Sequence, residues 1–441
     1  MAPFIHDDEQ KFFLPTREAQ RTGGHGAENR ADPDMLLGTD SRAAMLDRAE
    51  DISVALEWKL LLPLLARGVK DPRPSDRRQV LEAQDENDVQ ACMEQAYGSI
   101  AQAIRKAGET AVTMHSLLKD NLEEKDFWAS GWVVKKANSA EPLEEEKSFS
   151  GYVWVPVEIC SPKMRFQDPE TQARMQRVMD VLNSSHRLAA NCTCEVHIHL
   201  GRMDGRPWSL PTLKRLGTLL WLAEPTLRSI RDPRSPNFHN VYTWGFAMRR
   251  HSRLARRVGE LATLPSDEQG TIPETHVLDA LQGPMAVPAE ERMALIEIWK
   301  TASHLELGQL LSGPAKKTRR LGFNFSAFGE EDERARRNPR TVEFRMMDGS
   351  VRADLILGWL AICGSIAQSA VSTSDGRFAA AIRTSLRQRI DEATIRDTRE
   401  TVGHRRGREF RELMQALGVA AEHYRGLEEK VTREHCLHLC A

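Results

Sequence analysis

Two histidines separated by one residue, His197 and His199, form the most informative local pattern in the chain. They belong to residues 190–200, a stretch whose composition predicts a β-strand. Side chains two positions apart on a strand point to the same face, so both imidazoles would line one wall while Val196 and Ile198 pack into a core. Such a wall can hold a metal ion or a phosphate, although ordinary hydrogen bonds could also satisfy both rings.

A zinc site made of Cys192, Cys194, His197 and His199 is one reading of the same stretch. The positions of these four residues along the strand argue against a zinc site. Both cysteines occupy even positions and both histidines odd ones, so a regular strand places the two pairs on opposite faces. Only a bulge would bring all four side chains together.

A second pattern places a carboxylate beside a guanidinium. Glu343 and Arg345 lie within residues 341–347, a predicted strand in which Val342 and Phe344 occupy the opposite face. The two side chains could form a simple ion pair. They could also supply a metal ligand next to a phosphate-binding group, since the planar guanidinium matches phosphate geometry.

Two further strands each carry a single carboxylate among apolar residues, namely Glu57 and Glu158. Each carboxylate alone is weak evidence, because the outer face of a strand often carries glutamate. Several carboxylates on one sheet face are costly to bury unless a cation compensates them. Oxygen ligands joined by imidazole favour Mg²⁺ or Mn²⁺.

The surrounding elements predict an α+β fold with a largely antiparallel sheet, helical insertions and C-terminal helices. The strands show no steady β-α-β rhythm, which disfavours a doubly wound fold. The expected strands span 52–63 (ended by Pro63), 127–135, 151–159, 190–200, 321–327 and 341–347. The expected helices span 89–107, 166–184, 213–231, 249–261, 290–311, 354–371 and 378–427, the last interrupted near Gly403.

Composition narrows the class of protein. The 441 residues include 61 Lys and Arg against 63 Asp and Glu, so no overall charge attracts nucleic acid or anionic lipid. Seven cysteines give no disulfide framework, and no apolar leader is evident, so we expect a cytoplasmic protein. The apolar stretch 355–367 is shorter than the roughly 20 residues of a membrane span, which predicts a buried helix. We expect a disordered polar arm over 1–50, one main domain over 51–375 and a helical extension over 376–441.

The order of these motifs resembles the amidoligase family, a branch of the carboxylate–amine ligase superfamily that includes glutamine synthetase and glutamate–cysteine ligase. The segments that carry the resemblance run in the family's order and include its His-x-His and Glu-Phe-Arg motifs: residues 54–58, 132–139, 158–162, 194–201, 324–326 and 341–349.

The resemblance implies a funnel-shaped site on the sheet that binds ATP, Mg²⁺, a small-molecule or peptide carboxylate, and an amine. Nucleic acid and membrane have no part in such a reaction. By this resemblance the metal ligands would be Glu57, Glu158, Glu343 and His197. The catalytic residues would be His197, His199 and Arg345, and the nucleotide would contact Arg345, His199 and Asn324.

Three positions depart from the family pattern. Ala55 replaces the first glutamate of a Glu-x-Glu pair, Ala137 replaces the aspartate of Asp-x-Ser, and Glu195 replaces the glycine before the first histidine. Loss of two acids would weaken a metal site, so a binding or scaffold protein without turnover is the rival hypothesis. A metal-dependent hydrolase that uses the histidine pair is a third.

Overall fold

The computed structural model describes residues 47–147, 151–232, 247–264, 270–272, 277, 281, 287–315, 319–329, 340–372, 376–394 and 399–438. The chain divides into two compact units, Met1–Asp40 and Ser41–Ala441, and every described residue belongs to the second. Most of the expected polar arm therefore lies outside the described residues. The division at 50 and 375 stays a prediction.

Nine strands within the described residues form one open sheet, which confirms the largely antiparallel α+β architecture. The main path runs β3-β4-β5-β1-β7-β9-β8, while β2 and β6 pair with β1 beside it. All pairs are antiparallel except β3–β4 and β1–β2. The strands are β1 Ile52–Leu65, β2 Leu81–Glu82, β3 Ala111–Thr113, β4 Trp132–Lys136, β5 Tyr152–Cys160, β6 Met164–Arg165, β7 Glu195–Arg202, β8 Phe323–Asn324 and β9 Val342–Asp348.

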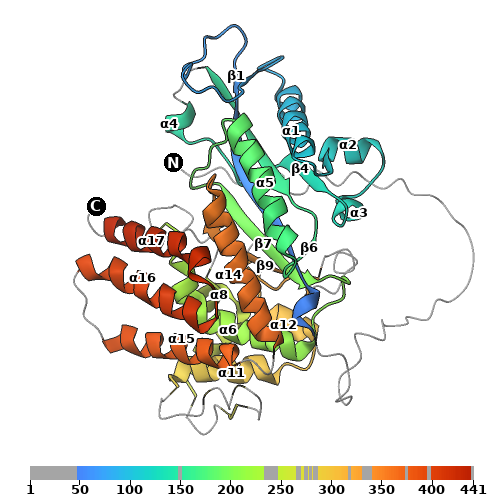
Figure 1. Cartoon of the computed structure of the whole chain (residues 1–441). Helices are drawn as coiled ribbons and strands as arrows, with labels where there is room; N and C mark the ends of the chain where they lie inside the picture. The colour runs from blue at the N-terminus through green and yellow to red at the C-terminus, as the bar shows by residue number, and fades with distance from the viewer. Residues whose placement is uncertain are drawn as a thin grey trace, which may run out of the picture. The chain divides into compact units, whose positions relative to one another are not determined.

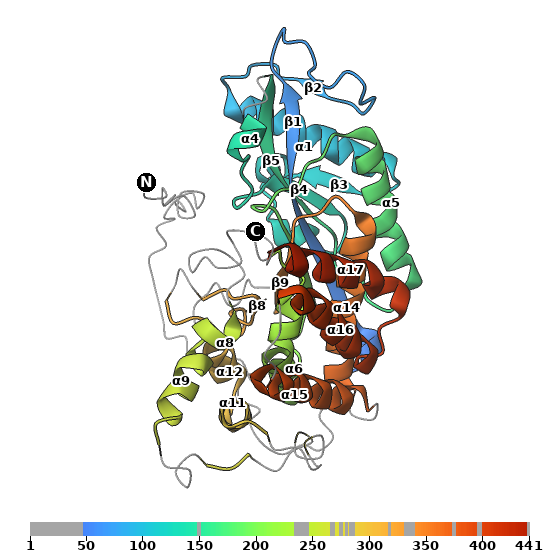
Figure 2. The same cartoon turned by 90° about the vertical axis from the view of Figure 1, so that its left-hand side faces the viewer.

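One face of the sheet is the main hydrophobic core. Strand alternation sends Val54, Leu56 and Trp58 of β1 into this core, where all three are fully buried. The helices α1 (Val89–Lys106), α5 (Pro169–Ser185) and α14 (Ala353–Val371) contribute to the same cluster and lie on one side of the sheet (Figure 2). The same alternation sends Glu57 and Lys59 to the other face.

The remaining helices surround this framework. α15, α16 and α17 lie side by side (Figure 1). α17 crosses α14 so closely that a Cβ added at Gly358 would lie 2.1 Å from the carbonyl oxygen of His423. The helices are α2 Met114–Lys119, α3 Glu124–Phe127, α4 Glu144–Lys147, α6 Leu210–Arg228, α8 Met248–His251, α9 Arg253–Leu261, α11 Ala289–Lys300, α12 His304–Leu310, α15 Arg377–Thr394, α16 Arg399–Ala416 and α17 Ala421–His438.

The apolar stretch 355–367 forms the centre of α14. This helix of 19 residues is long and apolar enough to cross a membrane by composition, yet 83% of its most apolar window is buried inside the protein. The prediction of a core helix is therefore confirmed.

Two of the predicted strand boundaries are wrong for identifiable reasons. β1 continues through Pro63, which pairs with Trp154 of β5. β7 pairs with β1 only as far as Trp58, so the proline interrupts no ladder between these two strands. β4 starts at Trp132 because residues 124–127 form α3, whose start is fixed by a capping box between Glu123 and Asp126.

Several longer elements are also shorter or more divided than predicted. Of the strand expected over 321–327, only Phe323–Asn324 pairs with β9, and β7 begins at Glu195 rather than at 190. The region 290–311 forms two helices, and so does 249–261, where Ser252 caps α9. The C-terminal region forms three helices, and Gly403 lies inside α16 rather than at a break.

Candidate functional site

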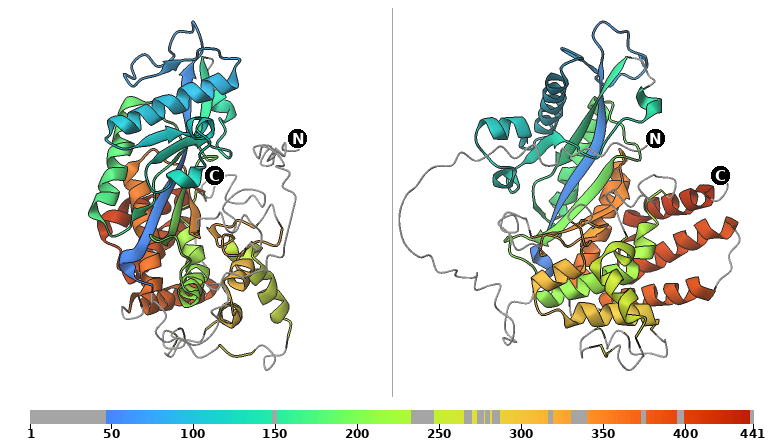
Figure 3. Two further views of the ribbon diagram at one scale, coloured as in Figure 1. Left: turned by 90° about the vertical axis from the view of Figure 1, so that its right-hand side faces the viewer. Right: turned by 180° about the vertical axis from the view of Figure 1, so that it is seen from behind.

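Glu57 bridges both histidines across the β1–β7 pair. Its Oε2 lies 3.1 Å from His197 Nδ1, and its Oε1 lies 2.9 Å from His199 Nε2. Glu57 is the direct register partner of His197, and the long β1 runs beside β7 (Figure 3). The same alternation that buries Val196 and Ile198 thus directs both imidazoles to one face, as the sequence predicts, and on this face they meet the Glu57 carboxylate.

β9 adds a second carboxylate on the far side of β7. Glu343 is the register partner of both His199 and Asn324, and its Oε1 lies 3.1 Å from His197 Nδ1. Asn324 Nδ2 donates a hydrogen bond of 2.7 Å to Glu343 Oε2. The Arg345 guanidinium donates to Glu343 Oε1. The structure therefore brings together six of the seven predicted site residues, namely Glu57, His197, His199, Asn324, Glu343 and Arg345.

A β-bulge shifts the register between β7 and β9 beside His197. Val196 pairs with Met347 and Ile198 pairs with Phe344, so two β9 residues lie opposite the single residue His197. Bulges commonly re-aim side chains beside functional sites. Here the shift places Asp348 opposite Glu195.

The seventh predicted residue, Glu158, has a different environment. It lies on β5, and one of its oxygens is within 4.8 Å of ligand atoms on Glu57 and Cys160. Lys135 Nζ is 3.3 Å from its Oε1 and Lys59 Nζ is 3.9 Å from its Oε2. Two ammonium groups thus already compensate this carboxylate.

Sequence reasoning missed one buried cation altogether. Arg231, just beyond the end of α6, is fully buried, and its Nη2 donates to Glu195 Oε1 at 3.1 Å and to the carbonyl oxygen of Arg345 at 2.9 Å. No local sequence pattern predicts a role for Arg231, because its partners lie on β7 and β9. The roles of Lys59 and Lys135 were missed for the same reason.

The charges in the cluster shift the pKa values of its members. Burial raises the pKa of Glu57, but His199 and His197 overcome this effect and hold the pKa well below its usual value. Burial also acts to raise the pKa of Glu343. The charges of Arg345 and of the two histidines outweigh it and hold this pKa well below its usual value. Both carboxylates are therefore ionised at neutral pH.

The histidines shift in the opposite direction. Burial acts to lower the pKa of His199, but the charge of Glu57 raises it above its usual value. At His197, burial, Arg345 and Lys59 act to lower the pKa, and hydrogen bonds with Glu195 and Glu343 raise it overall. The carboxylates thus stabilise cationic charge between them.

The donor set fits a divalent cation. Glu57, His197 and Glu343 each offer a ligand atom, and these three atoms lie within 4.8 Å of one another. Two carboxylates and an imidazole suit Mn²⁺ and also Mg²⁺, which prefers oxygen. The side chains of Glu57 and His199 are 23% and 19% exposed, so the cluster is open to solvent on this side.

The two alanine departures have different environments. Ala55 is half-buried and is the register partner of His199, so it lies beside the cluster. Ala137 is buried in a separate apolar cluster with Leu61, Ala140 and Cys194. Cys194 precedes β7 and belongs to that apolar cluster, which gives the zinc interpretation no support.

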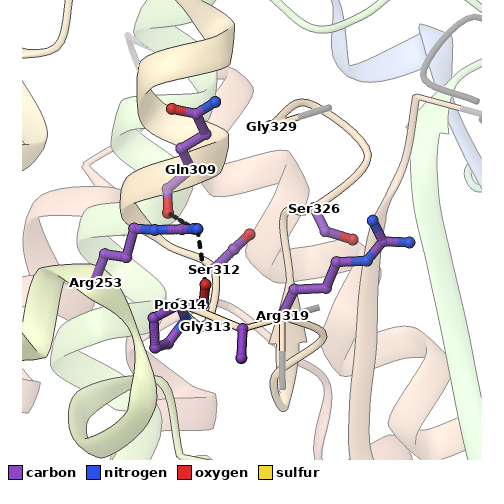
Figure 4. A pocket seen from close by; sticks show the side chains of 9 residues that line it. Arg253, Gln309, Ser312, Gly313, Pro314, Arg319, Ser326 and Gly329 are labelled. Atoms are coloured by element: carbon purple, nitrogen blue, oxygen red, sulfur yellow. Dashed lines mark hydrogen bonds between the residues drawn. The ribbon is translucent and has the colours of Figure 1, made fainter. Parts of the chain in front are cut away.

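A cavity of about 210 Å³ lies near the Asn324 end of the cluster (Figure 4). The backbone N–H of Ser326, which lines it, donates to Asn324 Oδ1. Arg253 and Arg319 lie on opposite sides of the cavity. The guanidinium of Arg253 donates to the carbonyl oxygens of Gln309 and Pro314. The volume is below the roughly 300–1,000 Å³ of drug-sized ligand sites, so this cavity is too small to hold a whole nucleotide.

Comparison with protein families supports the resemblance. The family described as "putative amidoligase enzyme" matches residues 83–257 of this chain. The matched region contains Glu158, His197 and His199, and the sheet joins it to Glu57 and Glu343 outside it. No curated protein and no solved structure gives a significant match.

Proposed function

We propose that this chain, a member of the amidoligase family by the match over residues 83–257, is an ATP- and Mg²⁺-dependent ligase that joins a carboxylate to an amine. One observation carries the proposal. Glu57 and Glu343, from strands on either side of β7, converge on His197 beside Arg345. The family match suggests a ligase, and this convergence supplies the ionic groups that phosphoryl transfer needs.

The chemistry follows from the weakness of a carboxylate as an electrophile. Transfer of the γ-phosphoryl group of ATP to the carboxylate oxygen would release ADP and form an acyl phosphate. Attack of a neutral amine on the acyl carbon would then form the amide and expel inorganic phosphate, with one proton lost from nitrogen.

Named residues have roles in this scheme. Glu57, Glu343 and His197 would hold Mg²⁺, with Glu158 as a further candidate. A bound Mg²⁺ would neutralise phosphate charge. Arg345 would stabilise the transferring phosphoryl group, and His199 and Asn324 would contact the nucleotide. The acid and the amine would be small molecules or peptide groups in the cytoplasm, without nucleic acid or membrane.

A binding protein without turnover is the second candidate. Two observations favour it: Ala137 lies in an apolar cluster where the family has an acid, and two lysines already compensate Glu158. Under this hypothesis the chain would bind nucleotide or metal but would release no ADP.

Calorimetric titration with a nonhydrolysable ATP analogue, with and without Mg²⁺, tests both candidates. We expect saturable binding that requires Mg²⁺ and that Arg345→Ala weakens. ADP release from ATP in the presence of pooled acids and amines would then support the ligase. Nucleotide binding without any ADP release would favour the second candidate, and the absence of binding at millimolar nucleotide would contradict the ligase.

A further inference from the structure

Glu195 lies between the first histidine and a buried arginine. Its Oε2 is 3.0 Å from His197 Nε2, and its Oε1 accepts a hydrogen bond from Arg231 Nη2. All three residues are fully buried. The resembling family has glycine at this position, so the carboxylate is a feature of this chain.

The contacts of the two ring nitrogens of His197 differ. Nε2 faces Glu195, whereas Nδ1 lies 3.1 Å from Glu57 Oε2 and 3.1 Å from Glu343 Oε1. Glu195 Oε1 accepts from Arg231 and its Oε2 also lies 3.9 Å from Arg345 Nη2, so two guanidinium groups hold this carboxylate in place. A carboxylate only accepts hydrogen bonds, so Nε2–H can donate to Glu195, and a cation between Glu57 and Glu343 would take the Nδ1 side.

We propose that Glu195 is a positioning residue that accepts the Nε2–H hydrogen bond of His197 and directs the Nδ1 lone pair toward a divalent cation held by Glu57 and Glu343. This inference rests on the metal site of the proposed function. Metal-binding histidines commonly donate their second N–H to a carboxylate, which fixes the tautomer and the ring orientation.

Arg231, which donates to Glu195, has ionic contacts of its own. Arg231 Nε lies 3.9 Å from Asp348 Oδ1, and Lys430 of α17 lies 3.4 Å from Asp348 Oδ2. Lys430 also donates to the carbonyl oxygen of Ile230. A line of ionic contacts thus connects the C-terminal helix to His197. His199 differs, because its Nδ1 lies 3.1 Å from the Thr341 hydroxyl rather than from a carboxylate.

Titration of the full-length protein with Mn²⁺ alone, without nucleotide, tests the proposal. Removal of a carboxylate behind a metal-bound histidine typically costs about 10–100-fold in affinity, and we expect a loss of this size in Glu195→Ala. Glu195→Gln should lose less, because its carbonyl oxygen can still accept from His197 Nε2, although its amide group would then face Arg231.

A second readout uses the tautomer of His197, measured by ¹⁵N NMR of the protein saturated with diamagnetic Mg²⁺. We expect the proton on Nε2 in the wild type and a mixture of tautomers in Glu195→Ala. This readout still decides the question with Glu195→Gln if the alanine variant does not fold.

Glu109 supplies the matched control. It is also a buried carboxylate that accepts from a ring N–H, Trp132 Nε1 at 3.4 Å, and from an arginine, Arg174. Glu109→Ala should lower stability and leave Mn²⁺ affinity unchanged.

Wild-type Mn²⁺ affinity in a folded Glu195→Ala variant, or a wild-type His197 protonated on Nδ1, would overturn the proposal. Failure of the wild type to bind Mn²⁺ would instead contradict the metal site of the proposed function.

Discussion

Glu57 and His199 lie 142 residues apart in the chain, yet their Oε1 and Nε2 atoms are 2.9 Å apart. The same carboxylate reaches His197 with its second oxygen. The order of strands in the sheet makes both contacts, because β1 and β7 are neighbours and β9 follows on the far side. The pairing register of these strands therefore brings the site residues together, and each strand contributes one or two of their side chains.

Replacement of Glu343 by glutamine tests the ionic character of the cluster. Glutamine has nearly the same volume but no charge, so Arg345 and His197 would lose one of the two carboxylates that they share. We expect nucleotide turnover to fall by roughly 100-fold or more, as is typical when a charged transition-state contact is lost. ADP release is the measurement, and Glu144→Gln, at an 89% exposed side chain, is the control. Wild-type turnover in Glu343→Gln would show that the site is assigned to the wrong residues.

Restoring the two acids of the family pattern should have different effects at the two positions. Ala55 is half-buried beside His199, so Ala55→Glu adds an oxygen donor near Glu57. We expect Mn²⁺ to bind about tenfold more tightly, equivalent to about 1.4 kcal/mol, in a calorimetric titration. Unchanged or weaker binding would show that position 55 does not face the cation.

Ala137→Asp forms the other half of this comparison. The residue is 1% exposed in an apolar cluster, and a carboxylate without a partner there costs several kcal/mol or drives protonation. We expect a lower Tm and no gain in Mn²⁺ affinity. Tighter Mn²⁺ binding would mean that the apolar cluster opens to the metal site.

The contact between α14 and α17 gives a stability prediction. In Gly358→Ala, the added methyl group would lie 2.1 Å from a backbone oxygen, so the two helices must separate. We expect a loss of about 1–3 kcal/mol, measured by denaturant unfolding. Gly98 is the control, since its added Cβ meets nothing within 4 Å inside α1. Gly98→Ala should stabilise the protein by about 0.5–1 kcal/mol. Equal effects of the two substitutions would contradict this helix packing.

His186 predicts a pH dependence of stability away from the candidate site. Burial, with a smaller contribution from Lys106, lowers its pKa to about 4, and its ring nitrogens contact the hydroxyls of Ser99 and Ser185. In the unfolded chain the pKa returns to about 6.5, so the unfolded state binds the proton first as the pH falls. Stability should therefore decrease between about pH 6.5 and pH 4, by at most about 1.4 kcal/mol per pH unit for this group.

His186→Gln removes this group and so isolates its contribution. The free energy of unfolding, measured across this pH range, should depend less on pH in the variant than in the wild type. Above pH 7 the two proteins should differ by a constant amount. Parallel curves down to pH 4 would show that the buried ring does not lose its proton on folding.

Much of the sheet and of the candidate site could be predicted because period-two alternation is a local signal. It separated Glu57, His197 and His199 from the core side chains of the same strands, and it identified Glu343 beside Arg345. Spacing alone could not show that these strands become neighbours, and the expected order came from the resemblance to a family.

Other features depended on partners that no local pattern reveals. Arg231 follows a helix, and its partners are 36 and 114 residues away. The pairing of Glu158 with Lys59 and Lys135 requires the register of three strands. The bulge in β9 is likewise a property of pairing, since two residues can face one only when both strands are present. Helix ends in the C-terminal region were missed because Gly403 is tolerated inside a packed helix.

The position of Arg231 between Glu195 and Asp348 also has an evolutionary consequence. A relative with glycine at position 195 would leave the buried guanidinium with one acidic neighbour, at 3.9 Å in this structure. We therefore expect the three positions to vary together among homologues. Sequences that have an acid at 195 should also have the arginine and the aspartate, whereas a glycine at 195 should accompany an uncharged residue at 231. An alignment of close and distant relatives would show this correlated replacement directly.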